Sequence, residues 1–245
     1  MMLRTLFKQN YLYGNALSSI MEFNINIIKI INETYDTKTF VFAKPNNFEF
    51  VSGQYCMLSF KGDETAKPFT FSSSPDNENL EITIKKIGKF TEKIHDSKQG
   101  DELILRGPFG TALNYEPEKD AIFIAGGSGI TPFISAIRYA KHIKNKKTII
   151  LFYANREEKD IIFREELENS GVQIIFVLTK VSDNKWNGET GYISEELILK
   201  YVNPDAQAWY ISGPPIMNKA LKNILTQLGV NDIRVEPWEI EGKST

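Results

Sequence analysis

The stretch Ala121-Ile-Phe-Ile-Ala-Gly-Gly-Ser-Gly-Ile-Thr-Pro132 decides how this chain folds. Its apolar start is typical of a buried strand, and a turn rich in glycine follows at once. Thr131 is placed to cap a helix, and Pro132 suits the first helical position. We expect that helix to turn one apolar face to the core, with the residues Phe133, Ile134, Ile137 and Ala140.

A strand, a glycine turn and a helix together predict a cradle for an anion. The N-terminus of a helix offers unpaired N–H groups and the positive end of the helix dipole, which suit a pyrophosphate. The spacing Gly127-x-Gly129-x-x-Pro132 lacks the last glycine of the dinucleotide fingerprint. Glycine turns also serve simply to reverse the chain, so this segment alone leaves both interpretations open.

Composition excludes several classes of protein. With 245 residues and a formal charge of −2, the chain has room for one large core or two modest ones, and it has no excess of basic residues. We therefore expect no nucleic-acid partner. Cys56 is the single cysteine, which excludes disulfides and cysteine-ligated iron–sulfur clusters within the chain. The two histidines are far apart in sequence, so we expect no metal site.

The chain carries no sign of a membrane span or a secretory leader. No run reaches the roughly 18 apolar residues of a membrane helix. Residues 1–21 begin with basic character but lack the long apolar region and cleavage site of a signal peptide. We interpret them as an N-terminal extension, either disordered or a short surface helix, and expect a cytoplasmic protein without membrane insertion.

Residues 22–114 follow the pattern of an all-β domain. Lys38–Phe42 is rich in β-branched and aromatic residues, and Leu80–Ile84 alternates apolar with polar residues, as a strand with one buried face does. Turn-forming pairs such as Ser52-Gly53 separate the strands. This pattern favours a barrel or a sandwich, and we predict an antiparallel β-barrel.

Residues 115–245 follow a different pattern, in which apolar strands alternate with helices. The expected strands are 148–153, 173–178 and 208–212, and the expected helices lie near 160–169, 194–202 and 216–228. Such alternation is typical of a doubly wound parallel sheet. The predicted architecture is therefore a β-barrel followed by an α/β nucleotide-binding domain.

Several short motifs, taken in order with the glycine turn, resemble the ferredoxin–NADP reductase superfamily. They are Lys67-Pro68-Phe69-Thr70, Gly88-Lys89-Phe90-Thr91, Ser212-Gly213-Pro214 and Glu236-Pro-Trp238. The resemblance runs from about Phe23 to Trp238 and implies an FAD-binding barrel followed by an NAD(P)-binding domain, without an iron–sulfur domain. It implies hydride transfer from NAD(P)H to flavin N5, then single electrons to a carrier protein. A non-catalytic electron-transfer or regulatory subunit with the same two domains is the alternative.

The resemblance assigns the flavin site residue by residue. Lys67 stands where the family has an arginine that holds the flavin pyrophosphate, and it offers a point charge instead of a fork. Phe69 would lie on the isoalloxazine without the hydroxyl of the family's tyrosine, and Thr70 would hydrogen-bond near N5. Gly88 to Thr91 would clamp a phosphate at the start of a short helix over 91–97, which favours FAD over FMN.

The nicotinamide side is assigned in the same way. The pyrophosphate would lie on the turn and helix start formed by Gly126, Gly127, Ser128, Gly129, Thr131 and Pro132. Ser212 replaces the cysteine that the family places near nicotinamide C4, and Gly213 and Pro214 would let the backbone approach. Glu236 would balance or relay charge beside the flavin, and Trp238 would cover the second ring face. The alternative for these two is an exposed acid and a packed indole at a last strand.

Arg156 bears on the choice between NADPH and NADH. An arginine after the second strand of such a domain accommodates a 2′-phosphate, whereas an acidic residue binds the ribose 2′-hydroxyl. Glu157 and Glu158 follow Arg156 and would repel a phosphate if they faced it. Our sequence-based preference is slightly for NADPH. The resemblance implies ferredoxin, flavodoxin or an oxygenase component as electron acceptor, and the sequence leaves the oligomeric state open.

Overall fold

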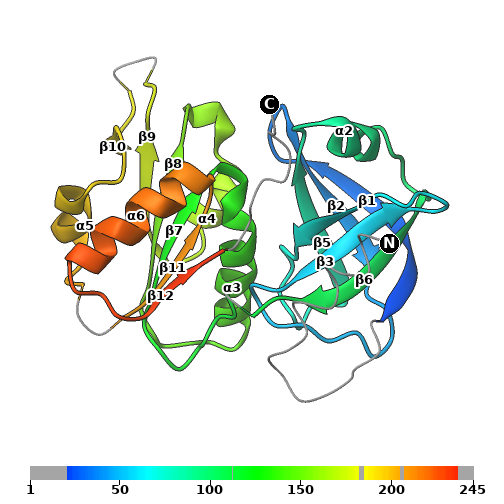
Figure 1. The fold of residues 1–245 in the computed structure, drawn as a ribbon, viewed down its shortest axis with the longest axis horizontal. Coiled ribbons are helices and arrows are strands. Elements are labelled where there is room, and N and C mark those ends of the chain that lie inside the picture. Colours follow the sequence, from blue (N-terminus) through cyan, green and yellow to red (C-terminus); the bar gives the residue numbers. More distant parts are fainter. Residues whose placement is uncertain (1–20, 112, 182–184, 205–206, 237–245) are drawn as a thin grey trace.

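The computed structural model describes residues 21–111, 113–181, 185–204 and 207–236, and its first half is an antiparallel sheet (Figure 1). The strands are β1 (Glu22–Asn32), β2 (Thr37–Ala43), β3 (Tyr55–Phe60), β4 (Ala66–Thr70), β5 (Asn79–Lys85) and β6 (Glu102–Phe109), in the order β4-β3-β6-β1-β2-β5. A bridge between Phe71 and Ile82 joins the chain just beyond β4 to β5. This bridge closes the sheet into the predicted barrel.

Alternation along the strands fills the barrel interior. On β5, the side chains of Leu80, Ile82 and Ile84 are buried, because residues two apart share one face of a strand. Aromatic rings pack among these aliphatic side chains, for example Phe48 and Phe71 with ring centroids 5.6 Å apart in an edge-to-face contact. Helix α2 (Lys89–His95) covers one end of this core.

The second half is a parallel sheet with helices on both faces. Its strands are β7 (Ala121–Gly126), β8 (Ile149–Asn155), β9 (Gln173–Leu178), β10 (Glu189–Thr190), β11 (Ala208–Ser212) and β12 (Ile233–Val235), in the order β10-β9-β8-β7-β11-β12. The helices are η1 (Gly127–Ile130), α3 (Thr131–His142), η2 (Glu158–Asp160), α4 (Arg164–Glu168), α5 (Glu195–Tyr201) and α6 (Pro215–Gln227). The predicted fold class, a β-barrel followed by a doubly wound sheet, is confirmed.

Strand order places a topological switch point at the carboxyl ends of β7 and β11. The chain passes from β7 to β8 and β9 on one side, and β11 and β12 lie on the other side. The direction of winding therefore changes between β7 and β11, and ligands of such sheets bind at this switch point. The boundary predicted at residue 114 lies in the connection between β6 and β7.

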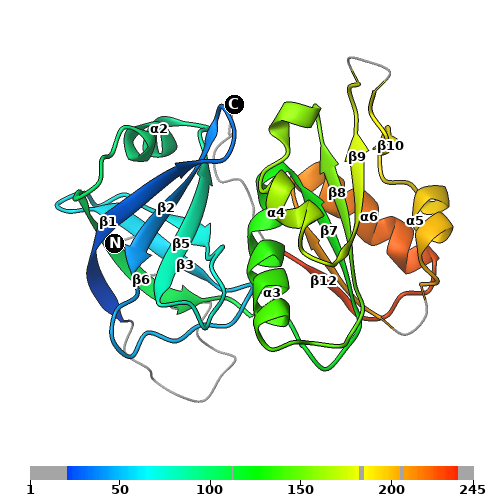
Figure 2. The same ribbon diagram turned by 180° about the vertical axis from the view of Figure 1, so that it is seen from behind.

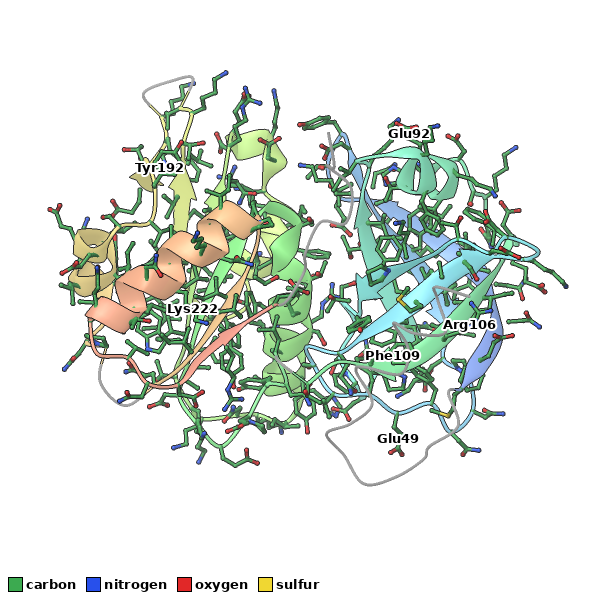
Figure 3. All side chains as sticks on the ribbon, viewed as in Figure 1. Glu49, Glu92, Arg106, Phe109, Tyr192 and Lys222 are labelled. Atoms are coloured by element: carbon green, nitrogen blue, oxygen red, sulfur yellow. The ribbon has the colours of Figure 1, made fainter. Side chains whose placement is uncertain are left out.

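Helix α3 lies between the two halves (Figures 1 and 2). Glu92 on α2 and Tyr192 after β10 lie toward the same end of the molecule, on opposite sides of this boundary (Figure 3). Among the helices of the described ranges, none combines the length and apolar character that a bilayer span needs. The N-terminal extension up to residue 20 and Trp238 lie outside the described residues.

Two predicted helices differ from the observed ones. The helix expected over 160–169 is only the short α4, preceded by η2 and by Phe163 at φ = 59°. Ile161, Ile162 and Phe163 are all buried, and three consecutive side chains of one helix cannot all face the core. Helix α2 begins two residues earlier than predicted, because Thr91 Oγ1 accepts the N–H groups of Ile87 and Gly88.

Gly53 provides a test of how closely the barrel packs on the connection to the second domain. Its φ is +99°, and a Cβ there would overlap the carbonyl group of Leu113. Gly100 has a similar φ of +96° with nothing within 4 Å of a Cβ. We expect Gly100→Ala to lower the free energy of unfolding by about 1–2 kcal/mol, and Gly53→Ala by a further ~1–3 kcal/mol. Urea unfolding of both variants measures the difference, and equal losses would contradict this account.

Candidate functional site

The glycine turn after β7 approaches β11 so closely that it tolerates no side chain at residue 129. A Cβ on Gly129 would overlap the carbonyl group of Ser212 and lie 2.8 Å from the amide nitrogen of Gly213. Gly127 has a φ of +53°, and a Cβ there would meet nothing within 4 Å. The turn is thus packed against β11 on one side and open on the other. This geometry fits the pyrophosphate of a dinucleotide.

Thr131 does not cap helix α3, contrary to the sequence-based expectation. Thr131 is the first residue of the helix, the capping position is Ile130, and Pro132 is the second residue. The hydroxyl of Thr131 donates to the carbonyl oxygen of Ser128 at 3.1 Å, because the 3-10 turn η1 already brings the chain into helical geometry. No side chain caps the helix, and the backbone N–H of Thr131 donates to the carbonyl oxygen of Ser128 within the preceding 3-10 turn.

Tyr153 is a residue of this site that the sequence analysis missed. Its hydroxyl donates to the carbonyl oxygen of Gly127 at 3.0 Å and accepts the N–H of Ile162 at 3.3 Å. Burial raises the pKa of Tyr153, so the phenol stays protonated. The sequence feature that could have identified this residue is a tyrosine within the otherwise apolar strand β8, because a buried phenol normally needs a hydrogen-bond partner.

Three residues that the resemblance singled out for catalysis meet at one carboxylate. Glu236 follows β12, where its N–H donates to the carbonyl oxygen of Ile211 at 3.0 Å. One oxygen of its carboxylate accepts the hydroxyl of Thr70 at 3.3 Å, and the other accepts the hydroxyl of Ser212. Thr70 ends β4 of the barrel, and Ser212 ends β11. The carboxylate therefore bridges the two domains at the switch point.

Strand alternation separates the rest of the flavin motif from Thr70. Phe69 packs with its ring centroid 5.9 Å from that of Phe90 of α2, at an interplanar angle of 25°. This contact brings the two predicted flavin segments together. Lys67 shares the face of Phe69 and is exposed, and Pro68 lies between them. A cation, an aromatic ring and a hydroxyl in this order fit a phosphate-linked ring system such as flavin.

The predicted phosphate clamp at Gly88 to Thr91 differs in one hydrogen bond from the sequence-based expectation. The N–H groups of Ile87 and Gly88 donate to Thr91 Oγ1 at 2.8 and 2.9 Å. The N–H of Gly88 is therefore already hydrogen-bonded to Thr91, and the first N–H group that a phosphate could use is that of Lys89. A Cβ on Gly88 would meet nothing within 4 Å, so the surface above it is open. The roles of Lys89, Phe90 and Thr91 stay predictions.

Gly213 and Pro214 directly follow β11 at the switch point. Pro214 precedes α6 directly. A Cβ on Gly213 would overlap the side chain of Met217 and lie 3.1 Å from the amide nitrogen of Gly126. The ends of β7 and β11 therefore meet at two glycines, Gly126 and Gly213, and the side chain of Met217 packs against both.

Arg156 lies in a charged cluster just beyond β8. Its side chain is 70% exposed, with Nε 4.0 Å from Glu157 Oε1. Glu157 also contacts Lys159 at 2.8 Å and Lys180 at 3.7 Å. The hydrogen bond from Lys159, together with the nearby positive charges, lowers the pKa of Glu157. Glu158 instead pairs with Arg164, so the two glutamates face different partners.

The close approach of Gly129 to β11 gives a direct test of the dinucleotide cradle. We expect Gly129→Ala to displace the turn and weaken NAD(H) binding by at least about tenfold, a loss of roughly 1.4 kcal/mol. The control is Gly229→Ala, since Gly229 has φ = +79°, nothing within 4 Å of a Cβ, and a position after α6. Isothermal titration with NADH, with circular dichroism to verify folding, makes the comparison. Equal affinity in the two variants would contradict the cradle.

Two protein families match this chain. Residues 22–152 match a family of FAD-binding domains, and residues 123–223 match the oxidoreductase NAD-binding domain family. The first match contains the barrel and the glycine turn, and the second contains the switch point. Binding domains for FAD and for a nicotinamide nucleotide are therefore present.

Similar proteins include reductases of different electron acceptors. NADH-cytochrome b5 reductase 2 of Debaryomyces hansenii is 35% identical over 240 residues, covering 89% of this chain and 77% of that protein. The glycine betaine monooxygenase reductase subunit of Pseudomonas aeruginosa is 31% identical over 219 residues, covering 82% of this chain and 59% of that protein.

Solved structures share the fold. The ferredoxin reductase in carbazole 1,9a-dioxygenase has a TM-score of 0.78 at 23% identity, covering 90% of this chain and 70% of that one. A ferredoxin NADP+ reductase from Neisseria gonorrhoeae with bound FAD and NADP has a TM-score of 0.77 at 21% identity, covering 88% of this chain and 98% of that one.

Proposed function

The chain belongs to the ferredoxin–NADP reductase family and is an FAD-dependent NAD(P)H oxidoreductase, as its sequence predicted; from this premise we propose NADH as its electron donor and a haem or iron–sulfur protein as its acceptor. The motifs at 67–70 and 88–91 would hold FAD, which would supply a hydride acceptor at N5 and one-electron transfer to the acceptor. The observation that carries the proposal is the meeting of Thr70, Ser212 and Glu236 across the domain boundary.

The residues of the chain have separable tasks in this reaction. The open side of the turn at Gly127 receives the nucleotide pyrophosphate, and the carboxyl end of β11 places Ser212 beside it. Thr70 presents its hydroxyl from the barrel, where the flavin motif lies. The Glu236 carboxylate accepts from both hydroxyls and can hold a proton between the two domains. Holding the reactants within roughly 3–3.5 Å is the main contribution that a protein makes to such a transfer.

The preference for NADH replaces the slight sequence-based preference for NADPH. A 2′-phosphate next to Arg156 would also lie beside the Glu157 carboxylate, which would repel it, whereas a ribose 2′-hydroxyl could donate to that carboxylate. The names of the fungal relatives also specify NADH. Both observations support NADH as donor.

The acceptor must come from outside the chain. The single cysteine, Cys56, is fully buried, and burial raises the pKa of its thiol, so it is neither a cluster ligand nor a redox group. One relative is named for cytochrome b5 and another for a monooxygenase. Those names support a one-electron acceptor protein such as cytochrome b5 or an oxygenase component, the latter being among the acceptors expected from the sequence. Ferredoxin and flavodoxin stay predictions.

Anaerobic stopped-flow absorbance of the FAD-loaded protein tests the proposal. We expect NADH to bleach the flavin band at least about tenfold faster than NADPH, equivalent to roughly 1.4 kcal/mol of discrimination. The reduced protein should then reduce cytochrome b5 or an oxygenase component in a second mixing step. Faster bleaching by NADPH would reverse the donor assignment. No bleaching by either nucleotide would favour the non-catalytic subunit.

Glu157 is expected to contribute to the choice of donor. Glu157→Gln removes a negative charge beside Arg156, and we expect kcat/KM for NADPH to rise about 1.4- to fivefold, the range typical of a pair of exposed charges. Glu158→Gln is the matched control, because Glu158 pairs with Arg164. Steady-state kinetics with both nucleotides decide the point, and the same rise in both variants would refute a role specific to Glu157.

A further inference from the structure

Helix α3 contacts the barrel through two polar side chains one turn apart. Ser135 is completely buried, and its hydroxyl donates to the carbonyl oxygen of Ser73 at 2.6 Å. Ser52 Oγ lies 3.0 Å from Ser135 Oγ and can donate to it. Arg138 follows three residues later on the same face, and its Nη1 donates to the carbonyl oxygen of Ser72 at 2.7 Å.

The guanidinium of Arg138 joins three segments of the chain. Nη1 also donates to Glu81 Oε2 of β5 at 2.7 Å. Nε and Nη2 each donate to one carboxylate oxygen of Glu166 of α4, both at 2.7 Å. The ring of Phe163 packs with its centroid 5.1 Å from the guanidinium carbon. Only arginine has the planar fork that these contacts require.

Burial makes these contacts stronger than ordinary surface ion pairs. The side chains of Arg138 and Glu81 are 19% and 20% exposed. Burial by itself lowers the pKa of Arg138, but the carboxylates of Glu166 and Glu81 raise it by more, so the guanidinium keeps its charge. A buried charge that loses its partners is costly, so the contacts are maintained together.

Ser72 is the point at which the barrel closes next to the flavin motif. Its N–H donates to the carbonyl oxygen of Glu81 at 2.8 Å, directly after the bridge between Phe71 and Ile82. Its hydroxyl lies 2.8 Å from Thr83 Oγ1. Ser72 is two residues beyond Thr70, so a shift of this segment would move the Thr70 hydroxyl with it.

The other end of the same helix begins at the dinucleotide cradle. Arg138 lies seven residues, or about 10 Å along the helix axis, from Thr131. The helix is continuous over Thr131–His142. A rigid element therefore joins the turn that holds the electron donor to the strand end that presents Thr70.

We propose that Arg138 is a positioning residue for hydride transfer, which fixes the flavin strand of the barrel relative to the dinucleotide cradle. It acts through Ser72 and Glu81, and among the contacts of the described residues it touches neither cofactor segment. The inference rests on the proposed hydride transfer from NADH. A displacement of about 1 Å between reacting groups can lower a rate by roughly 100-fold, so the rate should depend on this contact more than nucleotide affinity does.

Stopped-flow reduction of the FAD-loaded protein by NADH tests the proposal with three variants. We expect Arg138→Met to lower the limiting rate of flavin reduction about 10- to 100-fold and Arg138→Lys, which keeps the charge but not the fork, to lower it less. The dissociation constant for NADH should change less than about twofold. Arg164→Met is the matched control, since Arg164 pairs only within its own domain with Glu158 and Glu168 in the contacts described.

A second measurement is independent of activity. Amide hydrogen exchange of flavin-free protein should be faster at residues 71–73 and 81–82 in both Arg138 variants than in the wild type or Arg164→Met, because the barrel closure loses its support. If Arg138→Met fails to bind flavin, Arg138→Lys decides the question.

Two results would overturn the proposal. One is a wild-type reduction rate in a folded, flavin-loaded Arg138→Lys variant with unchanged exchange. The other is a loss of NADH affinity in proportion to the loss of rate. Failure of the proposed function looks different, because the wild-type flavin would then not be bleached by NADH at all.

Discussion

The structure depends on the close contact between Gly129 and the carbonyl group of Ser212. Because residue 129 has no side chain, the turn that leads from β7 into α3 can pack directly against the end of β11. That contact brings the carboxyl ends of β7 and β11 together at the switch point, where ligands of such sheets bind. The parallel register of β11 with β12 pairs Ile211 with Val235. Glu236 then follows one residue later and reaches Ser212. The cradle for a dinucleotide and the carboxylate beside it thus depend on one close approach.

The barrel supplies the other half of the site through its closure. The bridge from Phe71 to Ile82 fixes the end of β4, and alternation along β4 then turns Thr70 toward Glu236 and Phe69 toward α2. One strand can therefore present a hydroxyl to the neighbouring domain and an aromatic ring to its own. The arrangement explains why a short motif can contact a cofactor and a partner domain together.

Polar contacts hold the domains together at several points. Besides the carboxylate of Glu236, the hydroxyl of Tyr35 in the barrel donates to Asp160 at 3.0 Å, and Arg138 of α3 donates to Glu81 of β5 at 2.7 Å. Tyr35 is 71% exposed, so water competes with its hydrogen bond, whereas Ser135 of α3 is fully buried. Interfaces between domains are commonly more polar than cores. Their directional hydrogen bonds fix orientation, which a purely apolar contact specifies less sharply.

The sequence by itself determined the two domain types and the place of the glycine turn, because alternation and strand–helix order are local properties that neighbouring residues encode. It also indicated Thr70, Ser212 and Glu236, through motifs whose order along the chain is informative. Only the tertiary structure decided that one carboxylate joins those hydroxyls, that Thr131 lies inside its helix, and that Tyr153 holds Gly127. The helical pattern of α3 predicted its apolar face and gave no indication that Ser135 and Arg138 contact the barrel. Their contacts depend on a second domain packing against them, and hydrophobic periodicity within one helix carries no information about that packing.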